Sequence, residues 1–84
     1  MKVTNVGIKK VEKENSRLRG MASITLDNCL VIHNIRIIEG NKGLFIAMPS
    51  KKIEDKFFDL VHPINSETRK IFEDAIISKY NENE

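Results

Sequence analysis

The side chains of this chain that could do chemistry are mainly cationic, and the clearest group is the pair Lys51 and Lys52. Residues 1–26 hold six basic residues and two acidic ones, whereas in residues 27–84 the acidic residues outnumber the basic ones. Such an uneven distribution indicates a basic face that could bind an anion, phosphate backbones included. A lysine-rich surface that is only solvated produces the same counts, so charge alone leaves both interpretations open.

Groups suited to catalysis or metal binding are few, and the candidates are His33, His62, Asp59 and Cys29. We expect His33, on the core face of a strand, and His62, before a proline, to be hydrogen-bonded structural residues, and Cys29 to be a small core residue. The sequence has no glycine-rich phosphate loop, no paired metal-ligand spacing and no nucleophile elbow. We therefore predict a protein that is not an enzyme, with no catalytic residues, no metal and no cofactor.

The length of 84 residues fits one domain, predicted over 1–80, with a short polar tail at 81–84. A chain of this size buries only about 60% of the surface that its unfolded form exposes, so its own core is marginal. The single cysteine excludes an internal disulfide, which leaves a second copy of the chain as the expected support. No signal peptide and no membrane-spanning apolar run is found, so a cytoplasmic location without membrane contact is predicted.

Two strands joined by a hairpin are the clearest local structure. Segment 18–26 alternates between apolar and polar residues, as a half-buried strand does, and 3–11 is a further predicted strand. Asp27 and Asn28 tolerate the positive φ angles of a two-residue type I′ turn. We therefore predict a hairpin closed across these two residues.

The register of this hairpin assigns side chains to faces, with Leu26 paired to Cys29. It predicts one core face and leaves Leu30 and Ile32 on the other side; the predicted core residues are Ile24, Leu26, Val31, Ile35 and Ile37. The same register places Arg19 opposite Arg36. Like charges across a strand pair are destabilising unless an anion lies between them, or unless each arginine reaches solvent or a glutamate.

The apolar segment 44–48 does not alternate, which predicts that both of its faces are covered. Gly40 and Gly43 favour a tight return before it, and Pro49 ends its hydrogen-bonded ladder because proline lacks an N–H. One helix cannot cover both faces of a sheet, so we expect a second copy to cover the other. A last short strand is predicted within 57–62.

The last predicted element is a helix that begins near Asn65 or Ser66, either of which could cap it, and continues to about Tyr80. Its predicted apolar face consists of Thr68, Ile71, Phe72, Ala75, Ile76 and Tyr80. Its outer face carries the i,i+4 ion pairs Arg69–Glu73 and Lys70–Asp74. The predicted fold class is α+β: a small antiparallel sheet of four to five strands with one C-terminal helix, dimerising through its strands.

The segments "SITLD", "HNIRIIEG", "GLFIAMPSK" and "HPINS" occur in an order and spacing that resemble the SpoVG family, the stage V sporulation protein G septation regulators of bacteria. The resemblance covers nearly the whole chain. It implies a dimeric DNA- and RNA-binding regulator of septation, sporulation or gene expression. By position it points to Arg69 and Lys70 at the helix start and to Lys51 and Lys52 after "MPS". After Lys52 this chain is one residue shorter than the family pattern, lacks its glycine and has Phe58 at an arginine position.

Residues and resemblance together predict a homodimer that binds DNA, RNA or both through phosphate contacts. The predicted contact residues are Lys51, Lys52, Arg69 and Lys70, with Lys9, Arg19 and Arg36 as further candidates. The alternative is a protein-interaction module in cell-division control. In that case a sheet edge or an exposed Phe58 docks a protein partner and the basic residues are incidental.

Overall fold

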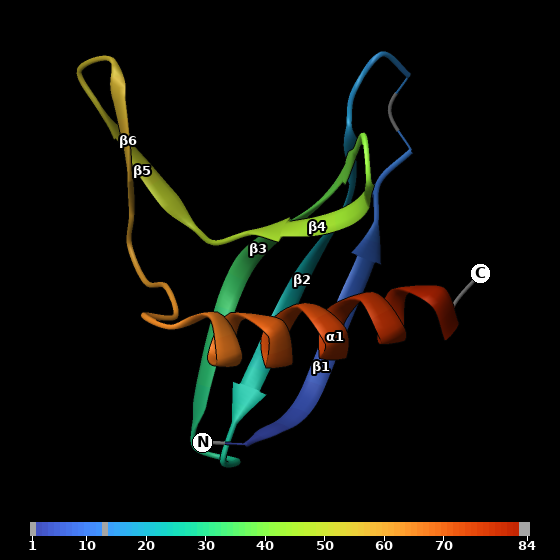
Figure 1. Ribbon diagram of the computed structural model, residues 1–84, viewed down its shortest axis with the longest axis vertical. Helices are drawn as coiled ribbons and strands as arrows, with labels where there is room; N and C mark the ends of the chain where they lie inside the picture. Colours follow the sequence, from blue (N-terminus) through green and yellow to red (C-terminus); the bar gives the residue numbers. More distant parts are fainter. Residues whose placement is uncertain (1, 13, 83–84) are drawn as a thin grey trace.

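The computed structural model describes residues 2–12 and 14–82. It contains six strands and one helix: β1 (Val3–Lys10), β2 (Leu18–Leu26), β3 (Leu30–Gly40), β4 (Gly43–Ala47), β5 (Ser50–Ile53), β6 (Lys56–Asp59) and α1 (Ser66–Glu82). The first four strands form one antiparallel sheet in the order β1-β2-β3-β4, and β5 pairs with β6 in a separate two-stranded sheet. The α+β class with one C-terminal helix is confirmed, with the strands divided between two sheets (Figure 1).

The helix covers one face of the four-stranded sheet and leaves the other face open (Figure 1). In β2 the predicted alternation is observed, since Gly20, Ala22, Ile24 and Leu26 are buried and the residues between them are half-buried. Phe72 and Ile76 of α1 pack on this surface. The buried core is Ala22, Ile24, Leu26, Ile32, Ile35, Ile37, Ile46, Met48, Phe72 and Ile76. Burying these apolar side chains supplies the main driving force for folding, about 1.5–3 kcal/mol for each large one.

The turn between β2 and β3 has the predicted conformation but a different register. Asp27 and Asn28 have φ angles of 50° and 53°, and the N–H of Cys29 donates to the carbonyl of Leu26 at 3.0 Å. Strand pairing, however, begins with Leu26 opposite Leu30, so Cys29 is an additional residue and is exposed. The prediction of Cys29 as a core residue is wrong for this reason.

A bulge in β3 shifts the register by one more residue. Asn34 has a φ of 64°, and the pairing slips between Ile24–Ile32 and Ala22–Ile35. Ile32 is therefore buried in place of the predicted Val31, and Ile35 returns to the core face as predicted. His33, beside the bulge, is exposed and is not a core histidine.

The predicted facing pair of arginines is also absent from the observed register. Met21 lies opposite Arg36, and a second slip between Leu18 and Gly20 removes Arg19 from the regular ladder. Both β2 and β3 carry irregularities. A register extrapolated from the turn is therefore wrong by the time it reaches Arg19, seven residues from Leu26.

Strand β4 is covered on one face only within this subunit. Gly40 pairs with Gly43 at the predicted tight return, and Ile46 and Met48 are buried. Phe45, on the opposite face, is 41% exposed. A single chain therefore covers one face of β4 and leaves the other open, as the sequence predicts, while the cover of the open face by a second copy stays a prediction.

Beyond Pro49 the chain forms an unpredicted strand, β5, which pairs with β6. These strands, residues 50–59, make a hairpin that projects from the body and is called the arm below (Figure 1). The predicted last strand within 57–62 is β6, which begins at Lys56 and ends at Asp59.

The helix begins as predicted and ends later. The Asn65 carboxamide oxygen accepts a 2.7 Å hydrogen bond from the N–H of Thr68, which identifies Asn65 as the N-cap. The helix includes Asn81 and Glu82, which the sequence predicts as part of the polar tail; residues 83–84 lie outside the described residues. Ile71 is 48% exposed and not buried as predicted, because the sheet contacts only the Phe72–Ile76 side of the helix at that level.

Candidate functional site

The arm pairs each of its two central lysines with a phenylalanine. Lys51 lies opposite Phe58 and Lys52 opposite Phe57. Cross-strand partners project on the same face and neighbours along a strand on opposite faces, so each face presents one ammonium group beside one aromatic ring. The ammonium of Lys52 lies 5.8 Å from the centre of the Phe57 ring. All four side chains are exposed, with Phe57 and Phe58 at 68% and 51%.

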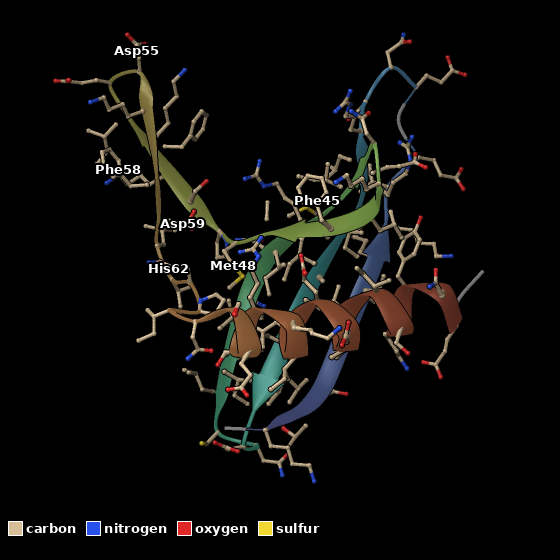
Figure 2. The ribbon with its side chains drawn as sticks, viewed as in Figure 1. Phe45, Met48, Asp55, Phe58, Asp59 and His62 are labelled. Carbon is tan, nitrogen blue, oxygen red and sulfur yellow. The ribbon has the colours of Figure 1, made fainter. Side chains whose placement is uncertain are left out.

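Carboxylates lie at the two ends of the arm. Glu54 and Asp55 form the turn at its tip, where Glu54 has a φ of 58°, and Asp59 lies near its base (Figure 2). The base is closed by a 2.8 Å hydrogen bond from the N–H of Leu60 to the carbonyl of Pro49. The cationic part of the arm is therefore its middle, between two acidic ends.

Arg69 is engaged within the subunit. Its Nη2 donates a 2.7 Å hydrogen bond to the carbonyl of Ile46, and its Nε lies 3.9 Å from Glu73 Oε2. The same Glu73 oxygen lies 3.5 Å from the N–H of Ile46. Glu73 and Arg69 thus bind the N–H and the carbonyl of Ile46, which both face away from β3. These groups lie on the outer edge of β4, where no further strand of the sheet pairs with them.

Lys70 is directed outward, with 77% of its side chain exposed and its ammonium 3.4 Å from Asp74. Both predicted helical ion pairs are confirmed. The helix start and the arm lie on the same side of the molecule, joined by the segment 60–65 (Figure 1).

The other three predicted cations lie on the main sheet. Met21 of β2 pairs with Lys9 of β1 on one side and with Arg36 of β3 on the other. The three residues therefore lie in one row across the sheet. Arg19 is neutralised locally, because its Nη2 lies 2.7 Å from Glu39 Oε2 and its Nη1 donates to the carbonyl of Ser16. The seven predicted residues therefore divide among the arm, the helix start and the sheet.

The arm is not predicted as a hairpin, although the sequence carries a signal for it. The two lysines and the two phenylalanines are spaced symmetrically about Glu54 and Asp55, which is the pattern of a hairpin with a two-residue turn. The absence of glycine in that turn concealed it. Lys56, opposite Ile53, is a further basic residue of the arm.

The histidines and the cysteine do not form a site together. His62 Nδ1 lies 3.1 Å from the carbonyl of Pro63, while His33 and Cys29 are exposed at separate positions of β3 and its turn. Among the described residues no three His, Cys, Asp or Glu side chains converge on a point suited to a metal ion. Within residues 2–12 and 14–82, no helix is long and apolar enough to cross a bilayer.

Comparison with known proteins gives one consistent result. The SpoVG family model matches residues 1–82. Similar relatives named "Putative septation protein SpoVG" come from Phytoplasma australiense, 57% identical over 95% of this chain and 83% of the relative, and from Caldicellulosiruptor bescii, 53% identical over 95% and 91%. A relative with the same name from Clostridioides difficile is 48% identical over 98% and 89%.

Proposed function

The chain belongs to the SpoVG family, and from this premise we propose that it is a regulatory protein that binds nucleic acid through its arm. The observation that carries the proposal is the pairing of Lys51 with Phe58 and of Lys52 with Phe57 on a ribbon that projects from the body. Ammonium groups neutralise phosphates, and the neighbouring rings offer surfaces on which bases stack.

The shape of the arm suits this role. A two-stranded ribbon fits the major groove of duplex DNA, and exposed rings suit the unstacked bases of a single strand. Lys70, and the exposed part of Arg69, add positive charge on the same side of the molecule. The carboxylates at the tip and the base limit the net attraction, so the proposed affinity is modest and strongly dependent on salt.

We further propose that the protein acts as a homodimer. Apolar side chains at the start of β3 and between the arm and the helix are exposed; this apolar ledge consists of Leu30, Val31, Leu60, Val61 and Ile64. It borders a hollow of about 360 Å³ beside Phe72 and another of about 350 Å³ beside Pro49. So much contiguous apolar surface on one small chain favours a subunit contact. A homodimer carries two arms, which doubles the number of cationic ribbons.

The cellular role follows by inference from the relatives, whose name refers to septation. We propose that this chain acts in the cytoplasm in the control of septation, sporulation or gene expression. A second candidate function is that of a protein-interaction module, favoured by the apolar ledge and by Phe58. In that case the ledge receives a division or regulatory protein and the arm has no nucleic-acid ligand.

The two functions differ in a binding experiment with matched variants. Fluorescence anisotropy is measured with a labelled 20-bp DNA duplex and a labelled single-stranded RNA at about 0.15 M salt. We expect Lys51→Gln/Lys52→Gln to weaken binding at least tenfold and to lower the salt slope on duplex by about 0.9 for each lost contact. Lys2→Gln/Lys42→Gln removes the same charge elsewhere and should change little. Equal affinity of the parent and the arm variant would refute the proposed role of the arm, and a parent that binds neither probe would favour the interaction module.

A further inference from the structure

The open face of the four-stranded sheet, which points away from α1, carries positive charge without acidic residues. Lys9 on β1 and Arg36 on β3 lie in one row on either side of Met21. Residues that alternate with the buried core positions define this face, and none of them is Asp or Glu. Among the described residues neither Lys9 nor Arg36 forms a salt bridge. Lys9 and Arg36 are two strand spacings apart, about 10 Å, and so present two positive charges across this face.

A shallow hollow lies beside this row. Gly7 is opposite Ser23, and a Cβ atom at Gly7 would come within 2.9 Å of Ser23 Oγ, so the glycine keeps the space open. The hollow measures about 290 Å³ and has Lys9, Ser23 and His33 in its lining. The bulge at Asn34 is what exposes the His33 ring at this position. Beside apolar lining residues, Lys9, Ser23 and His33 supply hydrogen-bonding groups of the kind that recognise base edges or sugars.

An aromatic ring lies on the same face at the other edge of the sheet. Phe45 is 41% exposed, and its ring packs against Gly40, where an added Cβ would lie 2.8 Å from its Cε1 atom. The glycine therefore gives the ring a flat support. A ring fixed in this way loses little conformational entropy when a base stacks on it.

We propose that the open face binds single-stranded nucleic acid. Lys9 and Arg36 contact phosphates, Phe45 stacks on a base, and the hollow at Gly7 receives another base or its sugar. A single strand is the fitting ligand because the face is shallow and because an exposed ring and a small polar hollow need unstacked bases. A second copy of the chain, which the apolar segment 44–48 led us to expect on this face, is a poorer fit, because a two-fold contact here would bring Lys9 and Arg36 of both copies into one interface.

The inference rests on the proposed function only in that the protein binds nucleic acid, and it uses a surface separate from the arm.

The test is fluorescence anisotropy with a labelled 12-nucleotide RNA, the DNA strand of the same sequence and a 20-bp duplex. We expect Lys9→Gln/Arg36→Gln to weaken the binding of both single strands at least tenfold and the binding of the duplex less than twofold. Gly7→Val fills the hollow with a residue that favours β-strands. It should weaken the binding of the single-stranded probes and leave duplex binding unchanged. Lys2→Gln/Lys42→Gln is the charge-matched control.

The outcomes separate this inference from the role of the arm. Single-strand binding that survives both open-face variants, or a parent that binds only duplex, overturns the open-face site whatever the arm does. An open-face variant that loses dimer mass in light scattering also overturns it, because the face is then a subunit contact. Selective loss of single-strand binding, with the arm variant unchanged on every probe, supports the open face and refutes the arm.

Discussion

The guanidinium of Arg69 donates a 2.7 Å hydrogen bond to the main-chain carbonyl of Ile46, and so joins the first turns of the helix to the edge of β4. An edge strand exposes unpaired main-chain groups to which another chain could add. Here Arg69 and Glu73 occupy both of these groups at Ile46. A residue predicted to be a phosphate ligand is thus also part of the architecture, and its substitution has two effects that must be measured separately.

The first prediction concerns this contact. We expect Arg69→Ala to lower the free energy of unfolding by about 1–2 kcal/mol, because a charge-assisted hydrogen bond to a half-buried carbonyl is lost. Lys70→Ala, one position along and exposed, should change it by less than about 0.5 kcal/mol. Urea unfolding followed by circular dichroism gives both values. Equal values for the two variants would show that the contact does not stabilise the fold.

The second prediction concerns the acidic ends of the arm. Two carboxylates about 10 Å from bound phosphates each cost on the order of 0.4 kcal/mol in water. Asp55→Asn/Asp59→Asn should therefore tighten duplex binding on the order of fourfold at low salt, and less at high salt. Glu12→Gln/Glu14→Gln, which removes the same charge far from the arm, serves as the control. An equal gain in both variants would indicate a response to net charge only.

The third prediction concerns the bulge in β3. Asn34 has a φ of 64°, a conformation that costs a β-branched residue about 1–2 kcal/mol and glycine very little. Asn34→Val should lower the free energy of unfolding by that amount, and Asn34→Gly should be nearly neutral. Chemical denaturation of the two variants beside the parent measures the difference. A valine variant as stable as the glycine one would mean that the strand pairs there without the bulge.

The fourth prediction concerns the apolar ledge. Light scattering should give the parent twice the chain mass of 9.6 kDa. Leu30→Glu/Val61→Glu should give the single-chain mass, because buried carboxylates without partners oppose association. Ile71→Glu, at an exposed apolar position outside the ledge, is the control and should remain dimeric. A parent that elutes as a monomer at all concentrations would refute the homodimer.

Much of the fold could be predicted from the sequence where a pattern runs without interruption. Strand β2 follows the predicted alternation and has the predicted bounds, and the helix start follows from the capping side chain of Asn65. The register of β3 could not be predicted, because an extra residue at Cys29 and a bulge at Asn34 change which side chains face the core without altering the local composition. Two such shifts restored Ile35 to the core face while displacing Val31 and His33 from it.

The candidate site was harder to predict than the fold. Lys51 and Lys52 were found by their charge, but their pairing with phenylalanines depends on a hairpin whose turn is Glu54-Asp55, residues that give a weaker turn signal than glycine. Arg69 and Arg19 have the same charge as the lysines, yet the hydrogen bonds from Arg69 to Ile46 and from Arg19 to Glu39 are tertiary contacts, which depend on the fold and not on local spacing. The row formed by Lys9 and Arg36 likewise depends on the registers of two strand pairs.

The hydrogen bond from Leu60 to Pro49 means that the chain leaves the body and returns to it at nearly the same place. We therefore expect a change in the length of residues 50–59 to alter the reach of the ribbon while the four-stranded sheet and α1 stay in place. The residues that set the reach of the protein toward a ligand are thus different from the residues that hold its core together.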